Sequence, residues 1–116
     1  MLIDCYDGDT CEFDVPRHDP LLGTLIHKAV KVRLADIDTP ELRKNKCQAE
    51  RDLGLKARAR LLELLKGAGR IDMLAIKRGH YGRVIARLLA DGQDVGAILL
   101  TEGLARRYQG KREAWC

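Results

Sequence analysis

Two short segments rich in acidic residues could hold a metal ion. The first is Asp7–Thr10, with the sequence DGDT, and the second is Asp36–Glu41, with the sequence DIDTPE. Carboxylates combined with a backbone carbonyl form an all-oxygen site, which suits a hard cation such as Ca²⁺ or Mg²⁺. Each segment also has an ordinary structural interpretation, because the first is typical of a hairpin turn and the second of a capped, proline-marked helix start.

Two arginines accompany these acidic segments. Arg33 lies five positions before Asp38, so strand alternation places their side chains on opposite faces unless a bulge or a turn intervenes. Arg83 follows Tyr81 and Gly82 at the entrance to a predicted strand. A guanidinium has paired donors that match a phosphate, and two of them could neutralise charge in a displacement at phosphorus. Taken singly, each arginine would be expected to form only a surface ion pair.

The elements that must position these residues are mostly strands. Alternating or β-rich segments predict five strands, over residues 2–6, 10–15, 29–37, 70–76 and 84–90. In the second of them, Cys11 and Phe13 fall on one side. The segment 16–23 contains two prolines and a glycine, which favours a loop.

Two helices complete the pattern. The hydrophobic period becomes helical over about 48–66, with one apolar face formed by Leu55, Ala59, Leu62 and Leu65. Asp94 is expected to cap a short helix that runs to about Leu100, with Gly103 as its stop. The order of elements predicts a mainly β protein with helices (α+β). More specifically, it predicts a five-stranded OB-type Greek-key barrel with one helix after the third strand and a short one after the fifth.

Length and composition limit the number of domains and the class of protein that the chain can form. The chain has 116 residues, enough for a single domain over 1–116 and too few for two. Its 46% hydrophobic and 33% charged residues exclude a disordered chain, and no apolar run is long enough for a membrane span. The excess of 21 basic over 17 acidic residues suits a polyanionic partner. We expect a monomer; no signal peptide is visible, and the compartment stays open because a precursor segment could have been removed.

Four cysteines are too few for a disulfide scaffold, and none has the CxxC spacing of a zinc site. Cys5 and Cys11 flank a predicted turn and could face each other across a hairpin. Cys47 could pair with Cys116, the last residue. Four free thiols are the alternative, and the sequence leaves both interpretations open.

Taken in order, the motifs resemble those of the staphylococcal nuclease (thermonuclease) family over roughly residues 3–108. The motifs that carry the resemblance are DGDT at 7–10, VRL at 32–34, DTPE at 38–41, YGR at 81–83 and EGLA at 102–105. The resemblance implies an OB-type barrel that hydrolyses phosphodiester bonds of DNA and RNA with Ca²⁺, leaving the phosphate on the 3′ side of the cut.

The resemblance also implies roles for the acidic residues. Asp9 and Asp38 would be direct Ca²⁺ ligands together with the carbonyl of Thr39, and Asp7 would support them. Glu41 would orient or deprotonate the attacking water.

The remaining implied roles concern the substrate. Arg33 and Arg83 would hold the scissile phosphate, and Tyr81 and Tyr108 would contact the nucleotide. The chain departs from the family at His80, where the family has a lysine; a contact from this histidine to phosphate would depend on pH near neutrality.

Two other functions compete with a nuclease. Nuclease-like domains without catalysis serve as nucleic-acid or protein binding modules, but such copies usually lose several of the site residues, and this sequence keeps Asp9, Arg33, Asp38, Glu41 and Arg83. A plain OB-type single-strand binder would need aromatic platforms, and the chain has one Phe, three Tyr and one Trp. The sequence does not decide between DNA and RNA or between endo and exo action.

Overall fold

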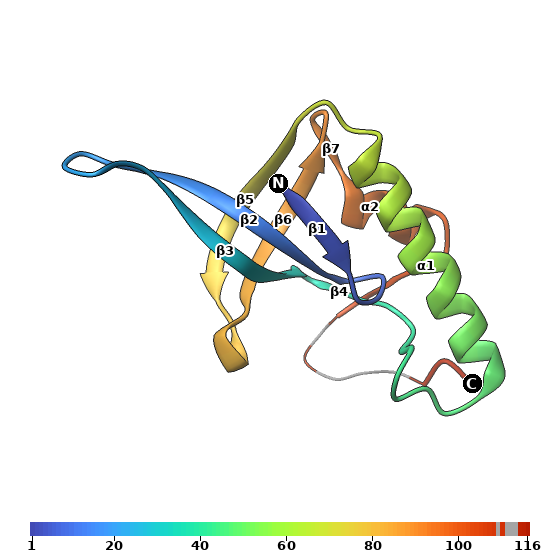
Figure 1. Cartoon of the computed structure of the whole chain (residues 1–116). Helices are drawn as coiled ribbons and strands as arrows, with labels where there is room; N and C mark the ends of the chain where they lie inside the picture. The colour runs from blue at the N-terminus through green and yellow to red at the C-terminus, as the bar shows by residue number, and fades with distance from the viewer. Residues whose placement is uncertain (109, 111–113) are drawn as a thin grey trace.

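The computed structural model describes residues 1–108, 110 and 114–116. It is mostly β with two α-helices, which confirms the predicted α+β class (Figure 1). In chain order the elements are β1 (Leu2–Cys5), β2 (Thr10–Asp19), β3 (Gly23–Leu34), β4 (Ile37–Asp38), α1 (Gln48–Lys66), β5 (Ile71–Arg78), the 3₁₀ turn η1 (His80–Gly82), β6 (Val84–Ala90), β7 (Gln93–Asp94), α2 (Val95–Thr101) and β8 (Arg106–Arg107). Within these residues, neither helix has the length and apolar character of a membrane span.

The main sheet is open, whereas we expected a closed five-stranded barrel. Its strand order is β1-β2-β3-β6-β5, with β7 added to β6, and β4 and β8 form a separate pair. Strands β3 and β6 are parallel and the other pairs are antiparallel. Closure would require hydrogen bonds between the edge strands β1 and β5. Strand β1 has only four residues, and in the described part of the chain it pairs with β2.

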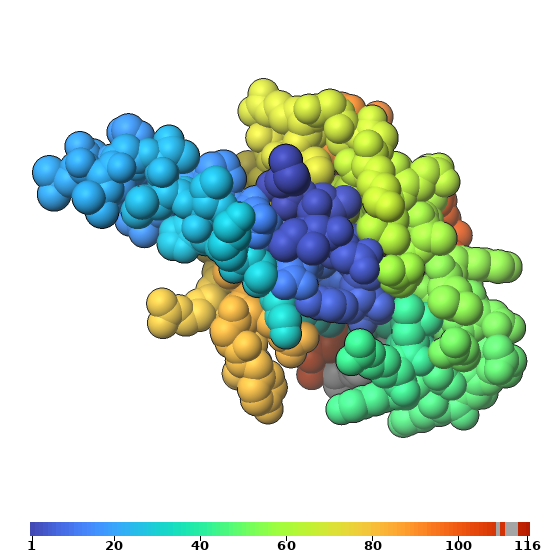
Figure 2. All heavy atoms as spheres, viewed as in Figure 1, coloured from blue at the N-terminus to red at the C-terminus, as the bar shows by residue number. Residues whose placement is uncertain are grey.

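The predicted loop over 16–23 is wrong, because β2 and β3 continue through it as a long hairpin. Pro16 pairs with Ile26, and the strands end only at Asp19 and Gly23. Proline is tolerated here because this part of β2 lies beyond β1 and forms a sheet edge. Figures 1 and 2 show the hairpin as an arm projecting from the body, which extends the molecule to 52 Å in its longest dimension.

Helix α1 has the predicted bounds, but it buries a different face. Leu65 is buried as expected, whereas Leu55 is 45% exposed and Ala59 is also exposed. The residues that α1 does bury are Glu50, Gly54, Ala57, Leu61 and Leu65.

Close packing explains why small residues face inward from α1. A Cβ atom on Gly8 would lie 2.7 Å from the Cβ of Ala57, and one on Gly54 would lie 2.9 Å from the carbonyl oxygen of Pro40. The first contact presses the turn before β2 against the helix. The second brings the segment that follows β4 against it. Larger side chains at these positions would push both acidic segments outward.

The core lies between the sheet and the two helices. Cys11 and Phe13 are buried together there, as the alternation of β2 predicted. The side chain of Asp94 accepts a hydrogen bond from the backbone N–H of Ala97, which confirms the predicted cap of α2.

Both disulfides that the sequence left open are formed. Cys5 bonds to Cys11 across β1 and β2, and Cys47 bonds to Cys116. The second bond ties the end of the chain to the start of α1, because Cys47 is the N-cap residue of that helix.

Candidate functional site

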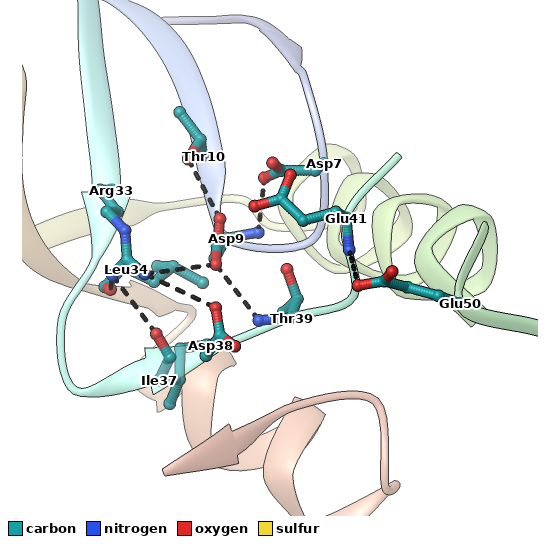
Figure 3. Close-up of polar contacts among 10 residues, drawn as sticks. All are labelled: Asp7, Asp9, Thr10, Arg33, Leu34, Ile37, Asp38, Thr39, Glu41 and Glu50. Carbon is teal, nitrogen blue, oxygen red and sulfur yellow. Dashed lines mark hydrogen bonds and ion pairs between the residues drawn. The ribbon is translucent and has the colours of Figure 1, made fainter. Parts of the chain in front are cut away.

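The guanidinium of Arg33 lies between two buried carboxylates. Its Nη2 atom is 3.6 Å from Oδ2 of Asp9 and 3.9 Å from Oδ1 of Asp38 (Figure 3). The two aspartates are only 5% and 3% exposed. Both carboxylates thus converge on one point, although Asp9 lies in the turn before β2 and Asp38 lies on β4.

A tight turn after β3 makes this convergence possible. Asp36 has φ 64° and lies in the turn that separates β3, which ends at Leu34, from β4, which begins at Ile37. This is the turn that simple strand alternation required for Arg33 and Asp38 to lie on the same side. Strand β8 then holds Asp38 in place, because Asp38 pairs with Arg106.

Arg33 is held by further contacts. Its Nη1 atom donates to the carbonyl oxygens of Leu34 and Ile37, at 3.2 and 3.3 Å. The guanidinium lies 5.4 Å from the ring centre of Tyr108. Tyr108 is 38% exposed and its backbone N–H donates to the carbonyl of Asp36. The predicted substrate residue Tyr108 is therefore beside the predicted catalytic residue Arg33.

Asp9 links the two acidic segments. Its Oδ2 atom accepts from the backbone N–H of Thr39 at 3.2 Å, and its Oδ1 atom accepts from the hydroxyl of Thr10 at 3.1 Å. Its own backbone N–H donates to Oδ1 of Asp7. This last contact is the short-range hydrogen bond that gives the DGDT turn its shape.

Negative charge accumulates at this place. Burial, together with the negative charges of Asp9 and Glu41, raises the pKa of Asp7 from its ordinary 3.8 to about 8. Figure 3 shows the carboxylates of Asp7 and Glu41 pointing toward each other. One guanidinium, that of Arg33, is shared by two carboxylates here, so the site favours a further cation.

Glu50 was missed by the sequence analysis. Its carboxylate is 5% exposed and accepts from the backbone N–H groups of Glu41, at 3.3 Å, and Lys46, at 2.7 Å. It therefore fixes the segment that carries Glu41. The sequence held a signal for it, because Glu50 comes three residues after Cys47, the N-cap, and an acidic residue there commonly reaches back to the chain before a helix.

Arg83 and Tyr81 lie in a neighbouring pocket of about 270 Å³, which is also lined by Asp7 and Thr10. Tyr81 is 94% exposed. The predicted residue His80 is exposed in the η1 turn, with its ring centre 6.3 Å from that of Tyr81. Asp7 and Thr10 connect this pocket to the Arg33 centre.

The donors at the Arg33 centre fit a hard cation. Among the residues that the structure describes, no cluster of three or more His, Cys, Asp or Glu side chains is arranged as a metal centre. A cation here would instead use the two converging carboxylates, Asp9 and Asp38, with a backbone carbonyl such as that of Thr39. Oxygen donors of this kind are those that Ca²⁺ prefers.

Comparison with known proteins agrees with the motifs. A family model described as staphylococcal nuclease homologue matches residues 31–115. No curated protein matches the chain. The matched range includes Arg33, Asp38, Glu41 and Arg83 but begins after Asp9, so the assignment of Asp9 rests on the DGDT motif and on the geometry.

Proposed function

Because the chain belongs to the staphylococcal nuclease homologue family, we propose that it is a Ca²⁺-dependent nuclease that hydrolyses phosphodiester bonds of DNA or RNA. The observation that supports this best is the convergence of Asp9 and Asp38 on Arg33. A cation site beside a guanidinium is suited to a phosphate, which needs positive charge from more than one direction.

We assign the chain's own residues as follows. Arg33 and Arg83 bind the non-bridging oxygens of the scissile phosphate and balance the charge that increases in the transition state. Glu41 orients the attacking water and accepts its proton. Asp9, Asp38 and the carbonyl of Thr39 hold Ca²⁺, which when bound neutralises the phosphate.

Tyr108 has a positioning role in this proposal. Its ring lies over the Arg33 guanidinium, and its exposed side is available to a nucleotide. The resemblance of the motifs further implies that the product carries its phosphate on the 3′ side of the cut. Basic side chains in the segment before α1, namely Arg43, Lys44 and Lys46, would attract the polyanion.

The test is incubation with denatured DNA and with RNA, each with Ca²⁺ and with EGTA. We expect cleavage with Ca²⁺ and its loss on chelation, and an Asp38→Asn variant serves as the control against a contaminating nuclease. Cleavage unaffected by EGTA would contradict the proposed metal site. Binding without any cleavage would favour the alternative, a nucleic-acid binding module.

A further inference from the structure

A second group of residues surrounds the pocket beside the Arg33 centre. The pocket has a volume of about 270 Å³ and is lined by Tyr6, Asp7, Thr10, Lys31, Tyr81 and Arg83. Two of these residues, Tyr6 and Lys31, have no role in the function proposed above.

Strand register places Lys31 beside Arg83. In the parallel pairing of β3 with β6, Val32 is the partner of Val84, and Lys31 and Arg83 each come one residue earlier. Val32 is buried in the core, so Lys31 lies on the opposite face of β3, as does Arg33 two residues further on. Three cationic side chains therefore share one face of the sheet.

Tyr6 holds Lys31 at the pocket. The ammonium of Lys31 lies 5.8 Å from the centre of the Tyr6 ring, a cation–π contact. The Tyr6 hydroxyl donates to the carboxylate of Glu12, and Glu12 is the partner of Lys31 in the β2–β3 pairing. The hydrogen bond to Glu12 thus fixes the Tyr6 ring, and the ring in turn holds the Lys31 ammonium by the cation–π contact.

Tyr81 supplies an exposed aromatic ring at the same pocket. Its backbone has φ 57°, in the left-handed region that a tyrosine seldom adopts, and its side chain is 94% exposed. Such strain persists where the surrounding structure imposes it, and it is common at ligand sites. The ammonium of Lys31 and the exposed ring of Tyr81 match the phosphate and the base of a nucleotide.

We propose that Lys31 binds a second phosphate of a single-stranded polynucleotide, one nucleotide away from the scissile phosphate that Arg33 and Arg83 hold. Tyr81 stacks on the adjoining base, and Tyr6 is a positioning residue that acts through Lys31. The spacing agrees, because Lys31 and Arg33 are two strand residues apart, about 6.5 Å along β3. This subsite deepens the proposed nuclease function and rests on it for its place next to the cleaved bond.

The test compares Lys31→Gln with a matched control, Lys56→Gln, which removes the same charge from the exposed surface of α1. On a ten-nucleotide single-stranded DNA with Ca²⁺, we expect Lys31→Gln to raise KM about tenfold and to change kcat far less. The rise in KM is expected to be smaller on a dinucleotide with one phosphodiester bond. The control is expected to keep wild-type constants.

Binding without cleavage gives a second readout. With EGTA present, anisotropy of the same labelled oligonucleotide should show a salt dependence of log K that is weaker by about 0.7 for Lys31→Gln, the value for one lost phosphate contact on a single strand. Tyr6→Phe keeps the ring but loses the Glu12 bond. We expect Tyr6→Phe to raise KM less than Lys31→Gln does. In the double variant, KM should equal that of Lys31→Gln alone.

These outcomes distinguish failure of the proposed subsite from failure of the proposed nuclease function. Equal KM values and equal salt slopes for Lys31→Gln and Lys56→Gln would overturn the subsite, whether or not the chain cleaves DNA. If the wild type cleaves nothing but the salt slope still depends on Lys31, the nuclease proposal fails and the phosphate contact stands. Additive effects of Tyr6→Phe and Lys31→Gln would remove the positioning role of Tyr6.

Discussion

Arg33 is shared by two carboxylates, and that arrangement explains how so much negative charge is tolerated in one place. Asp9 and Asp38 are nearly inaccessible to water, and a buried carboxylate is costly unless it is paired or hydrogen-bonded. Arg33 contacts both, while Thr39 and Thr10 donate to Asp9. The same arrangement leaves the guanidinium partly exposed, where a phosphate can reach it.

Arg83 offers the cleanest test of a single catalytic side chain. The hydrogen bond described for its guanidinium is a long one, 3.5 Å, to the carbonyl of His80, so its loss should not harm folding. We expect Arg83→Ala to lower kcat about 10³-fold, as the loss of one group that stabilises transition-state charge commonly does. The measurement is steady-state cleavage of denatured DNA, with thermal unfolding of both proteins alongside.

The matched control is Arg51→Ala, which removes an exposed guanidinium from α1. It should leave both kcat and the unfolding temperature near their wild-type values. Near-normal turnover in Arg83→Ala would contradict the role assigned to this arginine.

The order of the motifs and their resemblance to the nuclease family selected Asp9, Arg33 and Asp38, which the structure brings together. They were not sufficient to place Arg33 against Asp38, since this depends on the left-handed conformation of Asp36. The role of Glu50 was also missed, because its partners are backbone N–H groups, which leave little trace in a sequence.

At the scale of elements, the segment between β4 and α1 depends on Glu50. A glutamine there would keep one acceptor oxygen but turn an amide N–H₂ toward a backbone donor. We expect Glu50→Gln to destabilise the protein by about 2 kcal/mol, the cost of an unsatisfied buried donor, and to lower kcat because Glu41 moves. Denaturant unfolding and DNA cleavage measure the two effects. A stable variant with full activity would show that Glu50 does not fix this segment.

Asp14 anchors the base of the β2–β3 arm and gives it a dependence on pH. The backbone N–H of Ala29 donates to Asp14, which lowers the pKa of this carboxyl, and the charge of Lys28 lowers it further. A lowered pKa means that ionised Asp14 stabilises the fold above its ordinary value of 3.8, and that this contribution is lost as the pH falls below it.

We therefore expect Asp14→Ala to unfold at a lower temperature than the wild type at pH 7. The difference should shrink as the pH is lowered toward 2, because wild-type Asp14 then becomes protonated. Thermal unfolding followed by circular dichroism across this range is the measurement. A difference that stays constant with pH would show that the carboxylate charge has no part in the anchor.

The sequence predicted the bounds of helices and strands better than it predicted which other parts of the chain they contact. Helix α1 and strand β6 have their predicted bounds, since helical periodicity and glycine stops are local signals. The sequence of the arm predicts a loop because Pro16 and Gly23 usually interrupt a strand, and the edge position of β2 is what permits the pairing. The buried face of α1 was misjudged because its close neighbours, such as Gly8, are distant in the sequence.

At the scale of the whole molecule, the Cys47–Cys116 disulfide joins the last residue of the chain to the start of α1, 69 residues away in the sequence. The Cys47–Cys116 bond fastens Trp115 and Ala114 near Glu41, where they line a common hollow with Lys44 and other residues. The guanidinium carbon of Arg106 lies over the Trp115 ring, 3.9 Å from the ring centre, and its Nη1 atom donates to the carbonyl of Ala114. The end of the chain therefore supports the wall of the candidate site.

Thiol titration in denaturant without a reductant should find no reactive group, and four after reduction. The Cys47→Ser/Cys116→Ser double variant should lose about 4 kcal/mol of unfolding free energy, because the bond spans 69 residues and restricts the unfolded chain. Two reactive thiols before reduction would mean that one bridge does not form.

Calorimetric titration of the protein with Ca²⁺ tests the shared site of Asp9 and Asp38 most directly, because it requires no substrate. We predict one site in the wild type, which Asp9→Asn and Asp38→Asn each abolish or weaken severely. Asp72→Asn, a change on β5, should bind as the wild type does. Wild-type Ca²⁺ binding in both Asp9→Asn and Asp38→Asn would contradict the account.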